Sequence, residues 1–506
     1  MLGPWGFLPL ATPGVLFVMA RLGRRVASAG RSAERTLGGF VLTSALALVA
    51  IRLLGALGIL TGLALLAALA LAVVALAATG GPLPSAARER IAAWRARPLV
   101  TRATAPLAIV AASTLCITVV AARWIPVWQW DALGYHLPYV DFALVARSFR
   151  GVPADMPYVS TYPHSIEMLM IALRAMLPDD RLVDLAEVPF GVVGAVAIAG
   201  TARLAGASRP VGLAAGCGWI VAPAVFLQMP TDYVDVASAA FFLTAAYFVL
   251  AVGADPAATA KMHRTRILLA GVSLAIYVGT KPNAPTSAAV LAALLLWSAV
   301  RVKELPAGLV AMAMLALGMA PFIDNVIRFG NPVWPVEVKI GPLLLPGKSS
   351  MEKLLASGAM APHLHGSTLS RVVRSWTTVV PPLPVFDMRI GGFGPLVVLA
   401  APFAVATLLR RDSGPGAESR SNRVTRWGVL LASVVAPDPS VARYVLSFPG
   451  LLLAFAAPFA HRVPPRARLA VGLAAGALGL AQIAQALPGL TGDGPPLLAY
   501  ASMTDD

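Results

Sequence analysis

The sequence predicts an all-α polytopic membrane protein with about 12–14 transmembrane helices and two long extracytoplasmic loops. Of its 506 residues, 58% are hydrophobic and only 13% are charged, whereas a soluble domain carries about 25% charged residues. Stretches such as residues 57–79 hold no charge at all, and the basic residues gather in alternate loops. These three observations exclude a soluble globular, a disordered and a coiled-coil protein.

The expected spans are apolar runs of about the length that crosses a bilayer. They lie at residues 5–20, 37–56, 58–79, 104–122, 185–203, 210–229, 234–253, 267–280, 284–301, 305–322, 392–410, 427–437, 444–461 and 469–488. The first run is followed by Arg21, Arg24 and Arg25, whereas a signal peptide has its basic residues before the apolar run. We therefore expect a retained helix whose N-terminus lies outside.

The charge distribution predicts the topology, because cytoplasmic loops carry an excess of Lys and Arg. The loops assigned to the cytoplasm are residues 21–36, 80–103, 204–209, 254–266, 302–304, 411–426 and 462–468. With their flanking arginines they hold 25 of the 40 basic and 6 of the 24 acidic residues. The net charge of +16 therefore reflects topology, and we expect no nucleic-acid partner. The two long loops, residues 123–184 and 323–391, fall on the opposite side.

Four parts follow from this topology. Residues 1–103 form N-terminal helices with basic cytoplasmic loops, and residues 104–322 form a transmembrane core that includes the first long loop. Residues 323–391 are the second long loop, and residues 392–506 are C-terminal helices. Cys116 and Cys217 lie in apolar runs, and we interpret both as small buried hydrophobic residues.

Four acidic residues from three segments can meet on the extracytoplasmic side. They are Asp131 in WDALGYHLP, Glu167 in YPHSIE, and Asp232 and Asp235 in the turn before residues 234–253. A carboxylate at the membrane surface can act as general base toward a hydroxyl group, and others can hold acceptor hydroxyls or a divalent cation. We predict these four as the catalytic candidates; the alternative is that they are solvated or pair with arginines of the same loop.

Cationic and aromatic residues on the same side are candidates for binding substrate. Lys281, Arg389 and Arg443 lie near helix ends, where a cation suits a phosphate or pyrophosphate; the alternative is contact with lipid headgroups. Tyr135, His136 and His164 flank the acidic motifs and are further binding candidates. The pair His363 and His365 has no third ligand placed beside it, so we assign no metal site.

These residues stand in a series of motifs in a fixed order. The series is DxxxYHLP at 131–138, YPxxxE at 162–167, DxxD at 232–235 with Phe241 and Phe242 following, GTK at 279–281, GNPVWP at 330–335, GGFGP at 391–395 and ARY at 442–444. The series resembles that of bacterial membrane glycosyltransferases of the C-type (GT-C) superfamily. In that superfamily the first loop has two adjacent acidic residues, whereas here Ala132 follows Asp131.

The resemblance implies a glycosyltransferase in the bacterial inner membrane with its active site on the extracytoplasmic side. It would transfer a sugar from a polyprenyl-phosphate-linked donor to a glycan, lipid or protein acceptor, with Asp131 as the general base. The resemblance implies no certain cofactor, although a divalent cation is possible. Two alternatives remain open: a transporter or flippase of a lipid-linked or polar solute, and a non-catalytic membrane assembly protein. Transporters usually show repeats and charges near the midplane, whereas here the acidic residues gather at one face.

Overall fold

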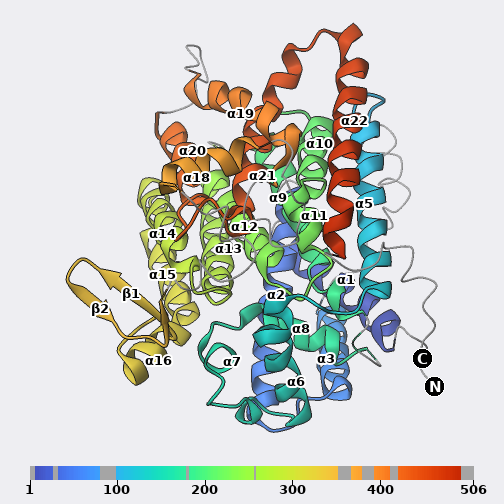
Figure 1. Ribbon diagram of the computed structural model, residues 1–506. Helices are drawn as coiled ribbons and strands as arrows, with labels where there is room; N and C mark the ends of the chain where they lie inside the picture. The colour runs from blue at the N-terminus through green and yellow to red at the C-terminus, as the bar shows by residue number, and fades with distance from the viewer. Residues whose placement is uncertain are drawn as a thin grey trace.

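The computed structural model is a bundle of helices with a small sheet at one side (Figure 1). It describes residues 6–26, 32–79, 99–177, 180, 182–255, 258–350, 366–378, 392–410 and 420–491. In these ranges, six helices are long and apolar enough to cross a membrane, or up to seven if one bent pair counts as a single span. The predicted fold class, a helical membrane protein, is confirmed.

The helices before the second long loop are α1 (Leu8–Val26), α2 (Ser32–Ala56), α3 (Gly62–Ala78), α5 (Ala105–Trp124), α6 (Leu137–Val145), α7 (Pro157–Thr161), α8 (Ser165–Arg174), α9 (Val188–Leu204), α10 (Arg209–Ile220), α11 (Pro223–Gln228), α12 (Asp235–Gly253), α13 (Ala260–Val278), α14 (Ala284–Arg301), α15 (Leu305–Gly318) and α16 (Ala320–Phe329). The later elements are β1 (Val336–Ile340), β2 (Leu343–Leu345), β3 (Ser349–Ser350), α18 (Thr368–Thr377), α19 (Gly394–Leu409), α20 (Arg420–Ala432), α21 (Ser447–Ala456) and α22 (Arg468–Ala486). Strand β1 pairs antiparallel with β2 and parallel with β3, and the β1–β2 hairpin projects from the helical body (Figure 1).

Proline divides two of the expected spans into shorter helices. In place of one helix at residues 210–229, α10 and α11 are separate and α11 begins at Pro223. Proline cannot donate a backbone hydrogen bond and disfavours helical backbone in the residue before it. Helices α15 and α16 likewise meet at 50°, with Pro321 in the first turn of α16. Conversely, the short expected span 267–280 belongs to α13, a helix of 19 residues.

Helix α12 is the centre of the core. Every residue from Asp235 to Val252 is buried, because the sequence of this helix is apolar around its whole circumference. Helices α2, α9, α13, α14, α20 and α21 pack around it. The N-terminus of α12, where Asp235 lies, is therefore held in place from several sides.

Small residues bring α1 and α2 into close contact. A Cβ atom added to Gly39 would overlap the carbonyl oxygen of Met19, and one added to Gly23 would overlap that of Arg35. Close approach of backbones through small residues is a common way for helices to associate in membranes. The N-terminal helices are thus packed against each other, and α2 also contacts α9 and α13 of the core.

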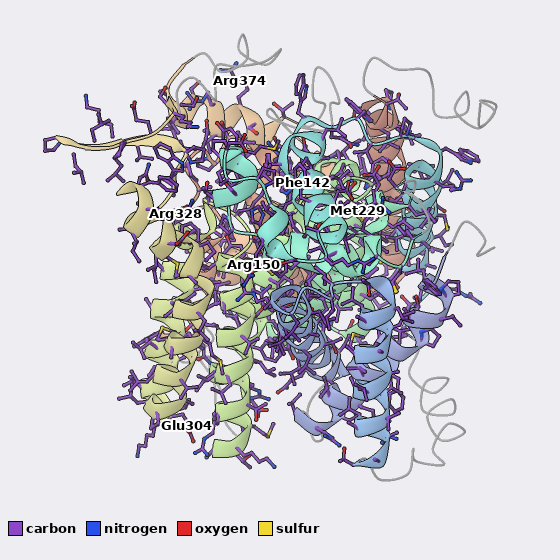
Figure 2. All side chains as sticks on the ribbon, turned by 90° about the horizontal axis from the view of Figure 1, so that it is seen from below. Phe142, Arg150, Met229, Glu304, Arg328 and Arg374 are labelled. Atoms are coloured by element: carbon purple, nitrogen blue, oxygen red, sulfur yellow. The ribbon has the colours of Figure 1, made fainter. Side chains whose placement is uncertain are left out.

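The loops assigned to the cytoplasm contact one another at one end of the bundle. The contacts join Arg266 to Glu34, Arg264 to Glu304, Asn422 to Gly253, Arg426 to Leu204 and His461 to Gly206. Glu304 lies at the opposite end from Arg374 of α18, which belongs to the second long loop (Figure 2). The assignment of the remaining loops to the two ends, and the side of the membrane that each end faces, stay predictions.

Cysteine labelling tests this orientation. Asp155 and Lys303 are both exposed, the first in the first long loop and the second at the Glu304 end. In a chain with Cys116 and Cys217 replaced by serine, we expect a membrane-impermeant maleimide added outside cells to label Asp155→Cys but not Lys303→Cys. Permeabilised cells provide the control, because both positions should then react. If only Lys303→Cys were labelled from outside, the predicted orientation would be wrong and the opposite one would hold.

Candidate functional site

Asp131 begins a π-helical turn, Ala132–His136, at the start of the first long loop. In this turn the Leu137 N–H bonds to the Ala132 carbonyl, five residues back, and π-turns within α-helices occur frequently at functional sites. The Asp131 N–H donates to the hydroxyl of Tyr233, with 3.1 Å between nitrogen and oxygen. Tyr233 is buried between α11 and α12, so the core fixes the position of the turn.

The carboxylate of Asp131 forms an ion pair with Arg443. Their Oδ2 and Nη1 atoms are 2.8 Å apart, and the same Nη1 lies 3.6 Å from Oδ2 of Asp235. The guanidinium carbon of Arg443 also lies 5.0 Å from the ring centre of Tyr233 and 5.3 Å from that of Tyr444. One arginine therefore joins two of the predicted carboxylates, from the first loop and from α12.

Lys281 supplies the second cation of the cluster. Its Nζ lies 2.5 Å from Oδ1 of Asp235 and 5.5 Å from the ring centre of Tyr444. Lys281 follows the end of α13, and the preceding Gly279 accepts a hydrogen bond from the Ser165 N–H of α8. The first long loop is thereby tied to the segment that carries Lys281.

Glu187 is a residue of the site that we did not predict from the sequence. Its Oε2 accepts hydrogen bonds from the N–H groups of Val236 and Ala237, at 2.6 and 2.9 Å. Helix N-termini leave such N–H groups without partners inside the helix, so the buried Glu187 carboxylate caps α12 directly beside Asp235. In the sequence it is a single acidic residue before an apolar run, with no motif around it.

A small pocket lies next to this cluster. It is lined by Asp235, Ser238, Ala239, Phe242, Tyr277, Lys281, Asn283, Arg443, Tyr444, Leu446 and Ser447. One part of the lining is charged or polar and the other is apolar, from α12, α13 and the start of α21. Asp131 lies beside the pocket, joined to it by Arg443.

The electrostatics keep Asp131 ionised. Burial opposes ionisation, but the charges of Arg443 and His136 and the hydrogen bond from Arg443 outweigh it and hold the pKa of Asp131 below its usual value. A carboxyl group that is ionised at neutral pH can accept a proton. Asp131 thus has the charge state that the predicted role requires.

Glu167 contacts two histidines and lies outside the lining of the pocket. Its Oε1 lies 2.7 Å from Nδ1 of His136 and 3.3 Å from Nδ1 of His164. All three residues are buried, and the ring of Tyr139 stacks on that of His164 with 3.8 Å between ring centres. Glu167 is therefore in contact with His136 and His164 and outside the lining of the pocket. This places Glu167 where it can orient the π-turn.

Contacts with His136 and His164 favour the ionised form of Glu167. Burial opposes ionisation, but His164 and His136 lower the pKa of Glu167 to about 2. Because this pKa lies below the ordinary value of 4.5, the group stabilises the fold above about pH 4.5 and loses that effect as pH falls toward 2. For Glu167→Gln we expect a lower melting temperature in detergent at pH 7, because glutamine keeps the shape of the side chain and loses its charge. The difference from the wild type should shrink at pH 3; an equal difference at both pH values would contradict the paired carboxylate.

Asp232 does not join the site. It is fully buried beside Asp184, outside the lining of the pocket, and burial raises the pKa of Asp232 to about 7. The DxxD motif thus places its two aspartates in different surroundings, because Asp235 is on the first turn of α12 and Asp232 lies in the preceding turn. Of the two aspartates of this motif, Asp235 is the one that contacts Lys281 and Arg443.

Arg389, His363 and His365 lie outside the described residues, so the assigned role of Arg389 stays a prediction. Within the ranges that the structure describes, no group of three or more His, Cys, Asp or Glu side chains is arranged to hold a metal ion. The helix predicted at residues 444–461 begins later in the structure than the sequence suggested. Arg443 lies in a 3₁₀ turn, Ala442–Val445, and α21 begins at Ser447.

The second long loop supports the segment that carries Arg443. From α18, Arg371 pairs with Asp438 at 3.1 Å, Ser375 donates to the Ser440 carbonyl, and Trp376 donates to the Pro439 carbonyl. Asp438 in turn accepts hydrogen bonds from the backbone and side chain of Ser440. Trp376 and Asp438 were not predicted, because their partners lie more than 60 residues away in the sequence.

Comparison with known proteins gives a likeness of fold. No family model and no curated protein matches the chain. The chain is similar to the crystal structure of the Archaeoglobus fulgidus oligosaccharyltransferase in the apo form, with a TM-score of 0.42 and 13% sequence identity. The match covers 74% of this chain and 56% of that chain, so this chain spans little more than half of its length. The likeness is one of fold alone.

Proposed function

We propose that this protein is a membrane glycosyltransferase of the GT-C type, which transfers a sugar from a polyprenyl-phosphate-linked donor to an acceptor hydroxyl group. One observation carries the proposal. Asp131 is held by Arg443 at the edge of a pocket that also contains Lys281 and Asp235. This cluster combines a carboxylate base with two cations at the start of the buried helix α12.

The cations suit the leaving group of such a transfer. A lipid phosphate leaves as an anion and needs no proton, and it is stabilised by positive groups placed where its charge develops. Lys281 and Arg443 lie on the same pocket, so both can contact one phosphate bound there. A polyprenyl phosphate keeps its chain in the bilayer, so its phosphate must bind at a helix end, as these two residues allow.

Asp131 is the proposed general base. It takes the proton of the acceptor hydroxyl while the acceptor oxygen bonds to the anomeric carbon and the bond from that carbon to the phosphate oxygen breaks. Negative charge thereby moves from Asp131 to the departing phosphate. Arg443 contacts Asp131 directly. Its guanidinium can therefore stabilise the carboxylate before the transfer and the departing phosphate during it.

The proposal places the site on the extracytoplasmic face of a bacterial inner membrane. This assignment rests on the charge asymmetry of the loops and on helix α12, which has Asp235 at its start and, near its other end, the Ala251 carbonyl that accepts a hydrogen bond from Arg266. The donor would then reach the pocket from the outer leaflet. The contact of Asp131 with Arg443 from a distant segment supports a shared site on that face.

The test separates an enzyme from a transporter. Purified protein in proteoliposomes is given polyprenyl phosphates that carry labelled hexoses or pentoses, together with a mixture of saccharide, lipid-alcohol and peptide acceptors. Both cleavage of the sugar–phosphate bond and movement of the donor between leaflets are measured. We expect cleavage of at least one donor, with release of polyprenyl phosphate. Movement of intact donor without cleavage would favour a flippase, and neither event with any donor would contradict both functions.

A further inference from the structure

Three tyrosines form a second surface beside Asp131. The ring centres of Tyr135 and Tyr162 are 5.4 Å apart, those of Tyr158 and Tyr162 are 5.3 Å apart, and those of Tyr135 and Tyr158 are 6.3 Å apart. Tyr135 lies in the same π-turn that Asp131 begins, and Tyr158 is in α7. We name these three residues the tyrosine cluster.

The tyrosine cluster is open to a ligand. Each of the three residues is partly accessible to solvent. Next to Tyr135, a Cβ atom added to Gly134 would meet nothing within 4 Å. The neighbouring Trp130 and Leu133 are 83% and 54% exposed. The face of the π-turn beside the cluster is therefore unobstructed.

The cluster is distinct from the pocket. None of its three tyrosines lines the pocket that contains Lys281 and Arg443. Asp131 touches both surfaces: it pairs with Arg443 and it precedes Tyr135 by four residues in one turn. In a transfer with Asp131 as base, the donor phosphate binds on the side of the cations, which leaves the cluster for the acceptor.

The chemistry of the cluster selects one class of acceptor. Aromatic rings stack on the apolar C–H faces of a sugar ring, and tyrosine also has a polar end that can form hydrogen bonds. Burial and the charge of Asp131 raise the pKa of Tyr135 above its usual value, so its hydroxyl stays protonated and can donate. Three rings with three hydroxyl groups next to a base suit a polyhydroxylated ring.

We infer that the tyrosine cluster is the acceptor subsite and that the acceptor is a saccharide. The inference rests on the proposed function and narrows it, since a glycan, a lipid and a protein were all open as acceptors. The acceptor sugar stacks on the cluster and presents one hydroxyl group to Asp131. The donor sugar reaches Asp131 from the side of the pocket where Lys281 and Arg443 bind its phosphate.

Saturation-transfer NMR on the whole protein in detergent micelles tests the inference. The probes are methyl pyranosides of several hexoses and maltose, a serine-containing peptide, and a short polyprenol. We expect at least one saccharide to receive saturation, with a loss of fivefold or more in Tyr158→Ala and a smaller loss in Tyr158→Phe, which keeps the ring. Trp427→Ala, which removes another partly exposed aromatic residue, should leave the signal unchanged.

Binding of polyprenyl phosphate, measured on the same samples, separates this inference from the proposed function. We expect wild type and Tyr158→Ala to bind it equally. If polyprenyl phosphate binds and no saccharide does, or if the Tyr158→Ala signal is unchanged, the saccharide subsite is wrong. A signal for the peptide or polyprenol that Tyr158→Ala removes would assign the cluster to that class instead. Failure of the wild type to bind polyprenyl phosphate would contradict the proposed function itself.

Discussion

Replacement of Asp131 by asparagine should abolish sugar transfer while the protein still inserts and folds. A positioned general base contributes about 10²–10⁴-fold to a rate, and asparagine cannot take the proton. The asparagine carbonyl can still accept the hydrogen bond that Arg443 now gives to the carboxylate at 2.8 Å. We therefore expect a fall of about 10²–10⁴-fold in turnover, measured as release of polyprenyl phosphate from labelled donor.

The matched control is Asp324→Asn. Asp324 is an exposed acidic residue of α16 that pairs with Arg328 four residues later at 3.1 Å, and exposed pairs of this kind contribute little to stability. Its replacement should leave turnover and expression unchanged. Full activity in Asp131→Asn, with correct insertion, would remove Asp131 as the base and leave Asp235 as the carboxylate to test.

The pH dependence follows from the same contacts. Because Arg443 and His136 hold the pKa of Asp131 below its usual value despite burial, the base is ionised at every pH from about 5 to 8. The contribution of Asp131 to turnover should therefore be constant over this range and be lost only on further acidification. The measurement is the rate of donor cleavage against pH.

The sequence predicted that Asp131, Glu167, Asp232 and Asp235 share one cavity, with cations on the same side. The structure joins Asp131 and Asp235 to Lys281 and Arg443, whereas Glu167 and Asp232 lie outside the lining of the pocket. Charge asymmetry placed them on one face, and helix ends limited where they could lie. These are local properties of the chain. The fold class was predicted for the same reason, since long apolar runs need no knowledge of tertiary contacts.

The roles of Glu167, Asp232 and Glu187 depend on tertiary contacts that the sequence does not contain. Glu167 shares a loop with Asp131, but the direction of its side chain depends on how α8 packs, and it contacts His136 31 residues away. Glu187 caps a helix that begins 48 residues later, and its bond to Val236 spans 49 residues. The sequence gives no signal for either contact. A single acidic residue before an apolar run, such as Glu187, looks like the flank of a helix.

Arg443→Ala should weaken the binding of polyprenyl phosphate more than any other single change among the cations of the pocket. Removing a hydrogen bond to a charged group costs about 1.5–3 kcal/mol, which corresponds to a loss of affinity of about 10–150-fold. Asp235 keeps Lys281 as its partner, but Asp131 loses its own. The pKa of Asp131 should then rise, so the acid limb of the rate profile should move to higher pH.

Arg443→Lys tests the geometry of the arginine, and Arg328→Ala is the control. A guanidinium presents a planar fork of donors, whereas an ammonium is a point charge, so lysine should recover part of the affinity and not all of it. Arg328 is an exposed arginine paired with Asp324, and its loss should leave donor affinity unchanged. Because Arg443 contacts both Asp131 and Asp235, an unchanged affinity in Arg443→Ala would mean that the arginine only holds the carboxylates. The phosphate would then be assigned to Lys281, and Lys281→Ala would be the next variant to measure.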